Sequence, residues 1–187
     1  MLNSLVGIIA SSGGAAAGGA YESISSTVVG AGGAANVTFS SIPQTYKHLQ
    51  VRFNLRVASG GTQDEMYLTL NGVGSSNANH GLWGNGSNAS VDALTYTSVI
   101  YIGKSIGGTG TSNVFTGGII DIHDYTSTTK YKTVRTFSGY DANGSGHVQL
   151  TSGFNYSDLT ALTSLSIRSN SNIAEFSTIS LYGIKGA

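Results

Sequence analysis

The chain has 187 residues and a mass of 19.2 kDa, a size that suits one domain with its own hydrophobic core. Nine Lys and Arg balance nine Asp and Glu, and charged residues make up only 10% of the chain, against about 25% in an ordinary domain. Nucleic-acid binding depends on clustered basic residues, so we expect no nucleic-acid partner. The chain has no cysteine, which excludes disulfides and thiolate metal sites.

The composition also predicts the fold class. Gly, Ser, Thr and Asn account for nearly half of the chain, and all four are poor helix formers. The ten Tyr and the many Val, Ile and Thr favour strands instead. We therefore expect an all-β protein. Because a weakly charged surface gives little protection against association, we also expect a homo-oligomer or a larger assembly.

Residues 1–20 differ from the rest of the chain. A short apolar run is followed by a Gly/Ala-rich stretch, and no Lys or Arg occurs before Lys47. A secretory signal would carry a basic start, and a membrane span would need about 20 apolar residues, so we expect no membrane partner. We interpret the segment as a flexible arm that docks on a neighbouring subunit, with a disordered terminus as the alternative. The predicted contact residues of this arm are Leu2, Leu5, Val6, Ile8 and Ile9.

From residue 21 onward, short strand-like runs alternate with turn signals. The clearest run is 48–57, where apolar and polar residues alternate with the period of a half-buried strand. The other predicted strands are 21–29, 35–40, 66–70, 96–103, 113–124, 130–140, 146–156, 161–168 and 174–184. Predicted core pairs in the later strands are Ile120 with Ile122, Leu165 with Ile167, and Ile179 with Leu181.

Turn signals separate these strands. Asn71-Gly72 and Asn143-Gly144 are dipeptides typical of tight hairpin turns. The segments 72–95 and 104–112 are predicted to be long loops. About ten strands without any helical period predict an antiparallel, jelly-roll-like β-sandwich over residues 21–187.

No motif in the chain carries a recognisable chemistry. Asp121, His123 and Asp124 have the spacing of a metal or acid–base site, but they fit the polar side of a half-buried strand better. The run 141–146 resembles the start of a calcium loop but lacks its last acidic ligand, where Ser152 stands. We therefore predict no catalytic residue, no metal and no cofactor, and a protein that is not an enzyme.

The most unusual local segment runs from His80 to Gly86 and contains Trp83, the only tryptophan. Packing of the indole under a loop is the favoured interpretation. A subunit interface and stacking on a sugar face are the alternatives for His80 and Trp83.

Several segments resemble a known group of proteins. They are SIPQTYKHLQVR at 41–52, the run from IIDI at 119–122 to KYKTVR at 130–135, SGYD at 138–141 and LYGIKG at 181–186. These segments are similar to those of tailed-bacteriophage virion proteins, common in phages of aquatic bacteria and cyanobacteria. The resemblance implies a non-enzymatic β-sandwich of the virion, used in head decoration or cementing or as a tail-fibre module.

Composition, arm and resemblance together predict a capsid decoration or cement protein on the capsid surface of a virion. In this hypothesis a homotrimer bridges neighbouring subunits of the major capsid protein through the arm. The alternative function is a receptor-binding or carbohydrate-binding module of a tail fibre, in which Trp83 stacks on host polysaccharide.

Overall fold

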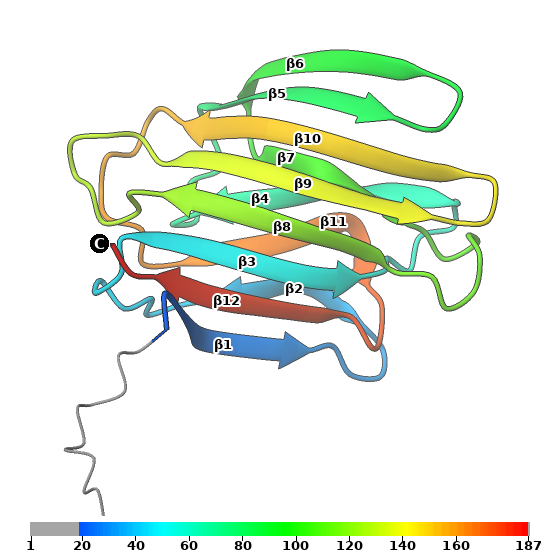
Figure 1. The fold of residues 1–187 in the computed structure, drawn as a ribbon, viewed down its shortest axis with the longest axis horizontal. Helices are drawn as coiled ribbons and strands as arrows, with labels where there is room; N and C mark the ends of the chain where they lie inside the picture. The colour runs from blue at the N-terminus through cyan, green and yellow to red at the C-terminus, as the bar shows by residue number, and fades with distance from the viewer. Residues whose placement is uncertain (1–18, 187) are drawn as a thin grey trace, which may run out of the picture.

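Twelve β-strands make up the regular secondary structure of residues 19–186, the part of the chain that the computed structural model describes (Figure 1). The all-β prediction is confirmed, with twelve strands instead of about ten. The predicted arm residues Leu2, Leu5, Val6, Ile8 and Ile9 lie outside the described residues. The strands are β1 Tyr21–Val28, β2 Ala34–Phe39, β3 His48–Leu55, β4 Gln63–Leu70, β5 Asn77–Gly84, β6 Ala89–Thr97, β7 Ile100–Ile106, β8 Thr116–His123, β9 Thr133–Asp141, β10 Gly146–Asn155, β11 Leu165–Ile173 and β12 Thr178–Ile184.

The strands form two antiparallel sheets of unequal width, in agreement with the predicted sandwich. The large sheet has eight strands in the order β1-β12-β3-β8-β9-β10-β5-β6. The small sheet has four strands in the order β2-β11-β4-β7 and lies behind the large one in Figure 1.

The hydrophobic core lies between the small sheet and the β12, β3 and β8 part of the large sheet. Residues that face inward on β3, such as Leu49 and Val51, are fully buried. Gly118 on β8 leaves space for the Phe53 ring, because a Cβ at this glycine would overlap the ring. The predicted core pairs are confirmed, since all six side chains are buried: Ile120, Ile122, Leu165, Ile167, Ile179 and Leu181.

Both predicted dipeptides form tight turns, but only the second one is a hairpin. Asn71 and Gly72 have φ angles of 48° and 70°, and Asn143 and Gly144 have φ angles of 60° and 99°, left-handed conformations that suit Asn and Gly. The first turn ends β4 and leads the chain from the small sheet to the large one, where β5 does not pair with β4. The second turn joins β9 to β10, and the amide of Ala142 donates to the carbonyl of Ser145 at 2.7 Å.

Three of the sequence predictions for the middle of the chain differ from the structure. The predicted loop 72–95 contains β5 and most of β6, and the predicted strand 96–103 is divided between β6 and β7. The predicted loop 104–112 begins only after β7 ends at Ile106. The strand in 77–84 gives a weak apolar pattern, because its inward residues include Asn77, Asn79 and Gly81. Regular pairing with β10 and β6 makes this polar segment a strand.

The different widths of the sheets leave part of the large sheet without a partner layer. β7 is the edge of the small sheet and packs mainly on β9 and β10, and only slightly on β5. The hairpin of β5 and β6 extends beyond this edge, at the top of Figure 1. This overhang sets the geometry of the candidate site.

Candidate functional site

The inward face of the large sheet changes from apolar to polar side chains between β8 and β10. On β8, apolar Ile120 and Ile122 face the core. On β10 the inward residues are polar and buried, and apolar residues such as Val148 and Leu150 are half-exposed on the outer face. The buried polar side chains of β10 are His147, Gln149, Thr151 and Asn155. A strand normally buries its apolar side, so β10 shows the reverse of the usual arrangement.

Five exposed apolar side chains follow one another across five neighbouring strands of the outer face, at directly paired positions. We call this set the apolar row, and its exposed fractions range from 39% to 75%. At about 4.8 Å between strands it is roughly 19 Å long. Contiguous exposed apolar surface of this kind marks interaction sites. The apolar row consists of Val91 on β6, Leu82 on β5, Leu150 on β10, Phe137 on β9 and Ile119 on β8.

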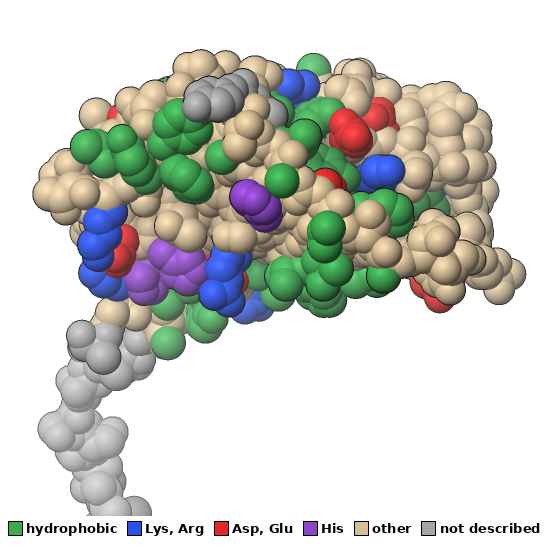
Figure 2. All heavy atoms as spheres, turned by 90° about the horizontal axis from the view of Figure 1, so that it is seen from above, with side chains coloured by type: hydrophobic (Ala, Val, Ile, Leu, Met, Phe, Trp, Pro, Cys, Tyr) green, Lys and Arg blue, Asp and Glu red, His purple; other side chains and the backbone are tan. Residues whose placement is uncertain are grey.

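The β6 end of the apolar row is hollowed. A shallow, open depression of about 570 Å³ is lined by His80, Leu82, Val91 and Leu150. Figure 2 looks down on the β6 edge and shows hydrophobic side chains gathered in patches, with charged groups between them.

A polar network bounds the other end of the row. The residue paired with Ile119 on β3 is Arg52, whose guanidinium lies 5.2 Å from the Tyr21 ring and 5.1 Å from the Tyr182 ring. Arg52 Nε donates to Gln50 Oε1 at 2.7 Å. The outer face therefore has an apolar half and a polar half.

On the inward side of the overhang, both sheets line a second concave surface, which we call the hairpin cleft. Its volume is about 430 Å³, within the range of small-molecule sites. One wall comes from β5 and β6, and the other comes from β4 and β7. The polar and aromatic residues that line it are Trp83, Asp92, Glu65, Tyr67, Tyr101 and Lys104.

A buried hydrogen-bond network holds the floor of the hairpin cleft. Tyr101 donates its hydroxyl proton to Gln149 Oε1 at 3.1 Å, and His147 Nε2 lies 3.0 Å from the same oxygen. Gln149 Nε2 donates to Thr151 Oγ1 at 3.2 Å. Burial raises the pKa of Tyr101 above its usual value, with a further contribution from the Glu65 charge, and burial lowers the pKa of His147. Both groups are therefore neutral at pH 7.

Asp92 brings a carboxylate oxygen into this polar region. Its Oδ1 is buried and has no hydrogen-bond partner among the described residues. Gly81 on the paired strand leaves the room for it, because a Cβ there would overlap this oxygen and lie 3.0 Å from Gln149 Nε2. A buried acceptor without a donor is costly unless a ligand or water satisfies it.

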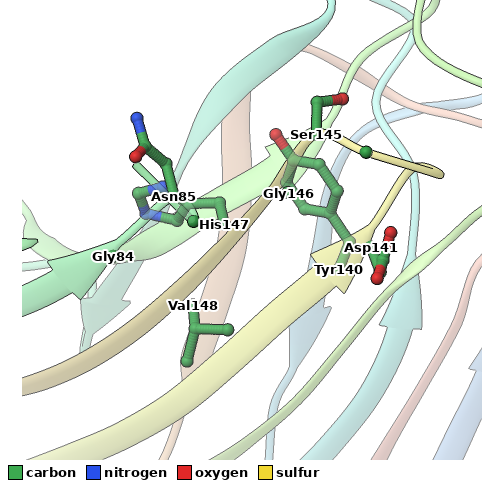
Figure 3. Close-up of a pocket in the computed structure, with 10 residues that line it drawn as sticks. Gly84, Asn85, Tyr140, Asp141, Ser145, Gly146, His147 and Val148 are labelled. Atoms are coloured by element: carbon green, nitrogen blue, oxygen red, sulfur yellow. The ribbon is translucent and has the colours of Figure 1, made fainter. Parts of the chain in front are cut away.

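A further shallow pocket lies between the β5–β6 turn and the β9–β10 turn. Figure 3 shows Asn85 and His147 on one side of it and Tyr140 and Asp141 on the other. The Tyr140 hydroxyl is engaged, since it donates to Gln63 Oε1 at 3.1 Å. Much of the remaining lining is glycine, so this pocket supplies few groups for recognition.

The structure separates the two residues that the sequence analysis grouped. His80 and Trp83 lie on β5, not in a loop, and they point to opposite faces of the large sheet: His80 lies beside the apolar row, and Trp83 lines the hairpin cleft. The indole is half-buried and stacks on His147, with ring centroids 5.6 Å apart.

The residues weighed as a metal or acid–base site have other contacts. Asp121 accepts a hydrogen bond from Gln50 Nε2 at 2.8 Å. Asp124 pairs with Lys47 and Lys130, each at 2.8 Å, and these two partners lower its pKa. Within residues 19–186 no group of three or more His, Asp or Glu side chains is placed to hold a metal ion. The same part of the chain contains no helix that could cross a membrane.

Comparison of the chain with protein-family models, with curated proteins and with solved structures finds no match. The resemblance to phage virion proteins therefore stays a prediction, and the site has to be interpreted from its own geometry.

Sequence reasoning missed both the apolar row and most of the hairpin cleft. The sequence shows Val148 and Leu150 alternating with His147 and Gln149. It does not show which of the two sides of this strand is buried. The row depends on the register of five strands, and the cleft depends on where the small sheet ends. Only the single tryptophan indicated one wall of the cleft.

Proposed function

We propose that this chain is a structural protein of a phage virion, a capsid decoration or cement protein that is held on the capsid surface through the apolar row. The row carries the proposal, because it exposes five apolar side chains while the opposite side of β10 buries polar groups. The resemblance of four segments to phage virion proteins supports the virion as the place of action.

The size and organisation of the outer face fit such a role. Eight strands at about 4.8 Å spacing and about seven residues at 3.4 Å rise give a face of roughly 900 Å². A standard interface buries about 800 Å² per partner and combines an apolar centre with a polar rim. The apolar row and the network around Arg52 provide these two parts.

The partner in this proposal is the major capsid protein. A protein that binds only the assembled lattice stabilises the lattice by mass action. The low charge of the chain suits binding through apolar burial, worth about 25 cal/mol per Å², repeated over many copies. The copies at each site are expected to form a homotrimer, which analytical ultracentrifugation of the purified chain would measure.

The test is binding of the purified full chain to capsids that lack it, measured by co-sedimentation. Replacing Phe137 and Leu150 with Glu should reduce occupancy at least tenfold, because two carboxylates would be desolvated in the interface. Val28→Glu is the matched control, since Val28 is 66% exposed on the same sheet but at the β1 edge. Undiminished occupancy of the folded double variant would refute the proposal.

Deleting residues 2–20 tests the separate contribution of the arm. We expect the deletion to abolish attachment and leave the thermal unfolding of the sandwich unchanged. If the truncated chain attached fully, the apolar row alone would account for binding to the capsid. The arm would then have no role in attachment.

A further inference from the structure

The hairpin cleft has the features of a ligand site that capsid attachment does not use. Trp83 and Leu82 are neighbours on β5 and point to opposite faces of the large sheet. The cleft thus faces away from the apolar row, and the two surfaces share only Asp92 among their lining residues, since Asp92 also lines the depression at the β6 end of the row. The inference goes beyond the proposed function, and neither depends on the other.

The aromatic walls of the cleft are held in fixed positions. One face of the Trp83 indole is stacked on His147, so the ring contributes to the cleft through its remaining surface. Tyr67 lies 6.2 Å from Tyr101, measured between ring centroids, and its hydroxyl accepts a hydrogen bond from Asn170 Nδ2 at 3.3 Å. The Arg168 guanidinium lies 4.9 Å from the Tyr67 ring centroid. Fixed rings reduce the entropy that a ligand must lose on binding.

The polar groups of the cleft offer both acceptors and donors. Asp92 and Lys104 both line the cleft, and Asp92 Oδ1 is buried without a donor among the described residues. The Glu65 carboxylate already accepts a hydrogen bond from the Tyr67 hydroxyl. One free acceptor and one cationic donor beside aromatic surface suit a ligand whose groups both donate and accept and whose ring carries C–H bonds on its face.

A neutral sugar ring has these properties. We propose that the hairpin cleft binds a neutral saccharide, with the ring on Trp83, one hydroxyl donating to the Asp92 carboxylate and another accepting from the Lys104 ammonium group. The volume of about 430 Å³ accommodates one or two sugar units. A cationic amine is the competing ligand, since it would also satisfy Asp92 and contact aromatic rings.

The experiment uses the fluorescence of Trp83, the only tryptophan of the chain. The full chain is titrated with methyl glycosides of glucose, galactose, mannose, rhamnose and N-acetylglucosamine, and in parallel is applied to an array of neutral oligosaccharides. We expect at least one saccharide to shift the emission saturably, with a dissociation constant of about 1 mM for a ligand of this size.

Two variants decide whether such binding occurs in the cleft. Asp92→Asn keeps the shape of the side chain, and Lys104→Met removes the ammonium group. Each should weaken binding about tenfold, because each removes a charge-assisted hydrogen bond. His80→Gln, on the opposite face of β5, should bind as the unmodified chain does. The proposal is overturned if no saccharide binds, if binding is unchanged in both variants, or if tetramethylammonium chloride shifts the emission and the sugars do not.

Discussion

The two halves of the large sheet bury opposite kinds of side chain. In the half formed by β12, β3 and β8, inward residues such as Val51 and Ile120 are apolar and fully buried against the small sheet. In the half formed by β10, β5 and β6, the inward residues are largely polar, and the apolar residues face outward, where Leu150, Leu82 and Val91 form three of the five members of the apolar row. Both halves keep the same antiparallel pairing and the same period of two.

The comparison shows that the position of the second layer, not the strand pattern, decides what each half can do. Where the small sheet covers the large one, apolar burial stabilises the fold. Near the edge of the small sheet at β7, the inward side of the large sheet is held by a hydrogen-bonded network and opens into a cleft, and apolar side chains stay exposed on the outward side.

The largest loss of stability is expected from a substitution in the core half of the large sheet. Ile120→Ala should lower the free energy of unfolding by about 2–5 kcal/mol, because it leaves a cavity at a fully buried position. Its neighbour Ile119 is 39% exposed in the apolar row, so Ile119→Ala should change stability by no more than about 0.5 kcal/mol. Urea unfolding of both variants measures the difference. Equal losses would contradict the assignment of the two faces.

A smaller effect is expected from the polar half. Gln149→Leu should cost about 1–3 kcal/mol, because it leaves the Tyr101 hydroxyl and His147 Nε2 without their acceptor. Tyr101→Phe removes one of these donors, so the double variant should lose less than the two single variants together. Strict additivity in this double-mutant cycle would show that the network does not act as a unit.

The smallest expected effect is a pH dependence of stability. Burial lowers the pKa of His147, so the unfolded chain binds a proton more readily than the folded chain below its ordinary pKa of 6.5. The contribution of neutral His147 to the free energy of unfolding is therefore complete above pH 6.5. It decreases as the pH falls from 6.5 toward the lower pKa of the folded state. His48 acts with the same sign, again chiefly because of burial. The carboxylate of Asp124 acts only below its ordinary value of 3.8.

Thermal unfolding between pH 7.5 and pH 5 measures this dependence. The loss of melting temperature on acidification should be smaller in His147→Gln than in the unmodified chain, and the same as the unmodified chain in the exposed control His80→Gln. An unchanged pH dependence in His147→Gln would remove this histidine as a cause.

The sequence was most informative where one strand face is apolar. The 48–57 run alternates strongly, and the structure places β3 at His48–Leu55 with its predicted face in the core. The turn at Asn143-Gly144 was equally clear, because few residues other than Asn and Gly adopt its backbone angles. In contrast, the polar inward residues around Asn79 hid β5, and no local pattern indicated that Trp83 and His80 belong to different surfaces.

The amino-acid sequence by itself determined the all-β class, most of the strands, the tight turns and the main core, because backbone propensities and the period of two act over a few residues. The tertiary structure decided which face of β10 is buried, how five strands bring their apolar side chains into one row, and where the overhang opens a cleft. These features depend on strand register and on the width of the small sheet, which are set by contacts between residues far apart in the chain.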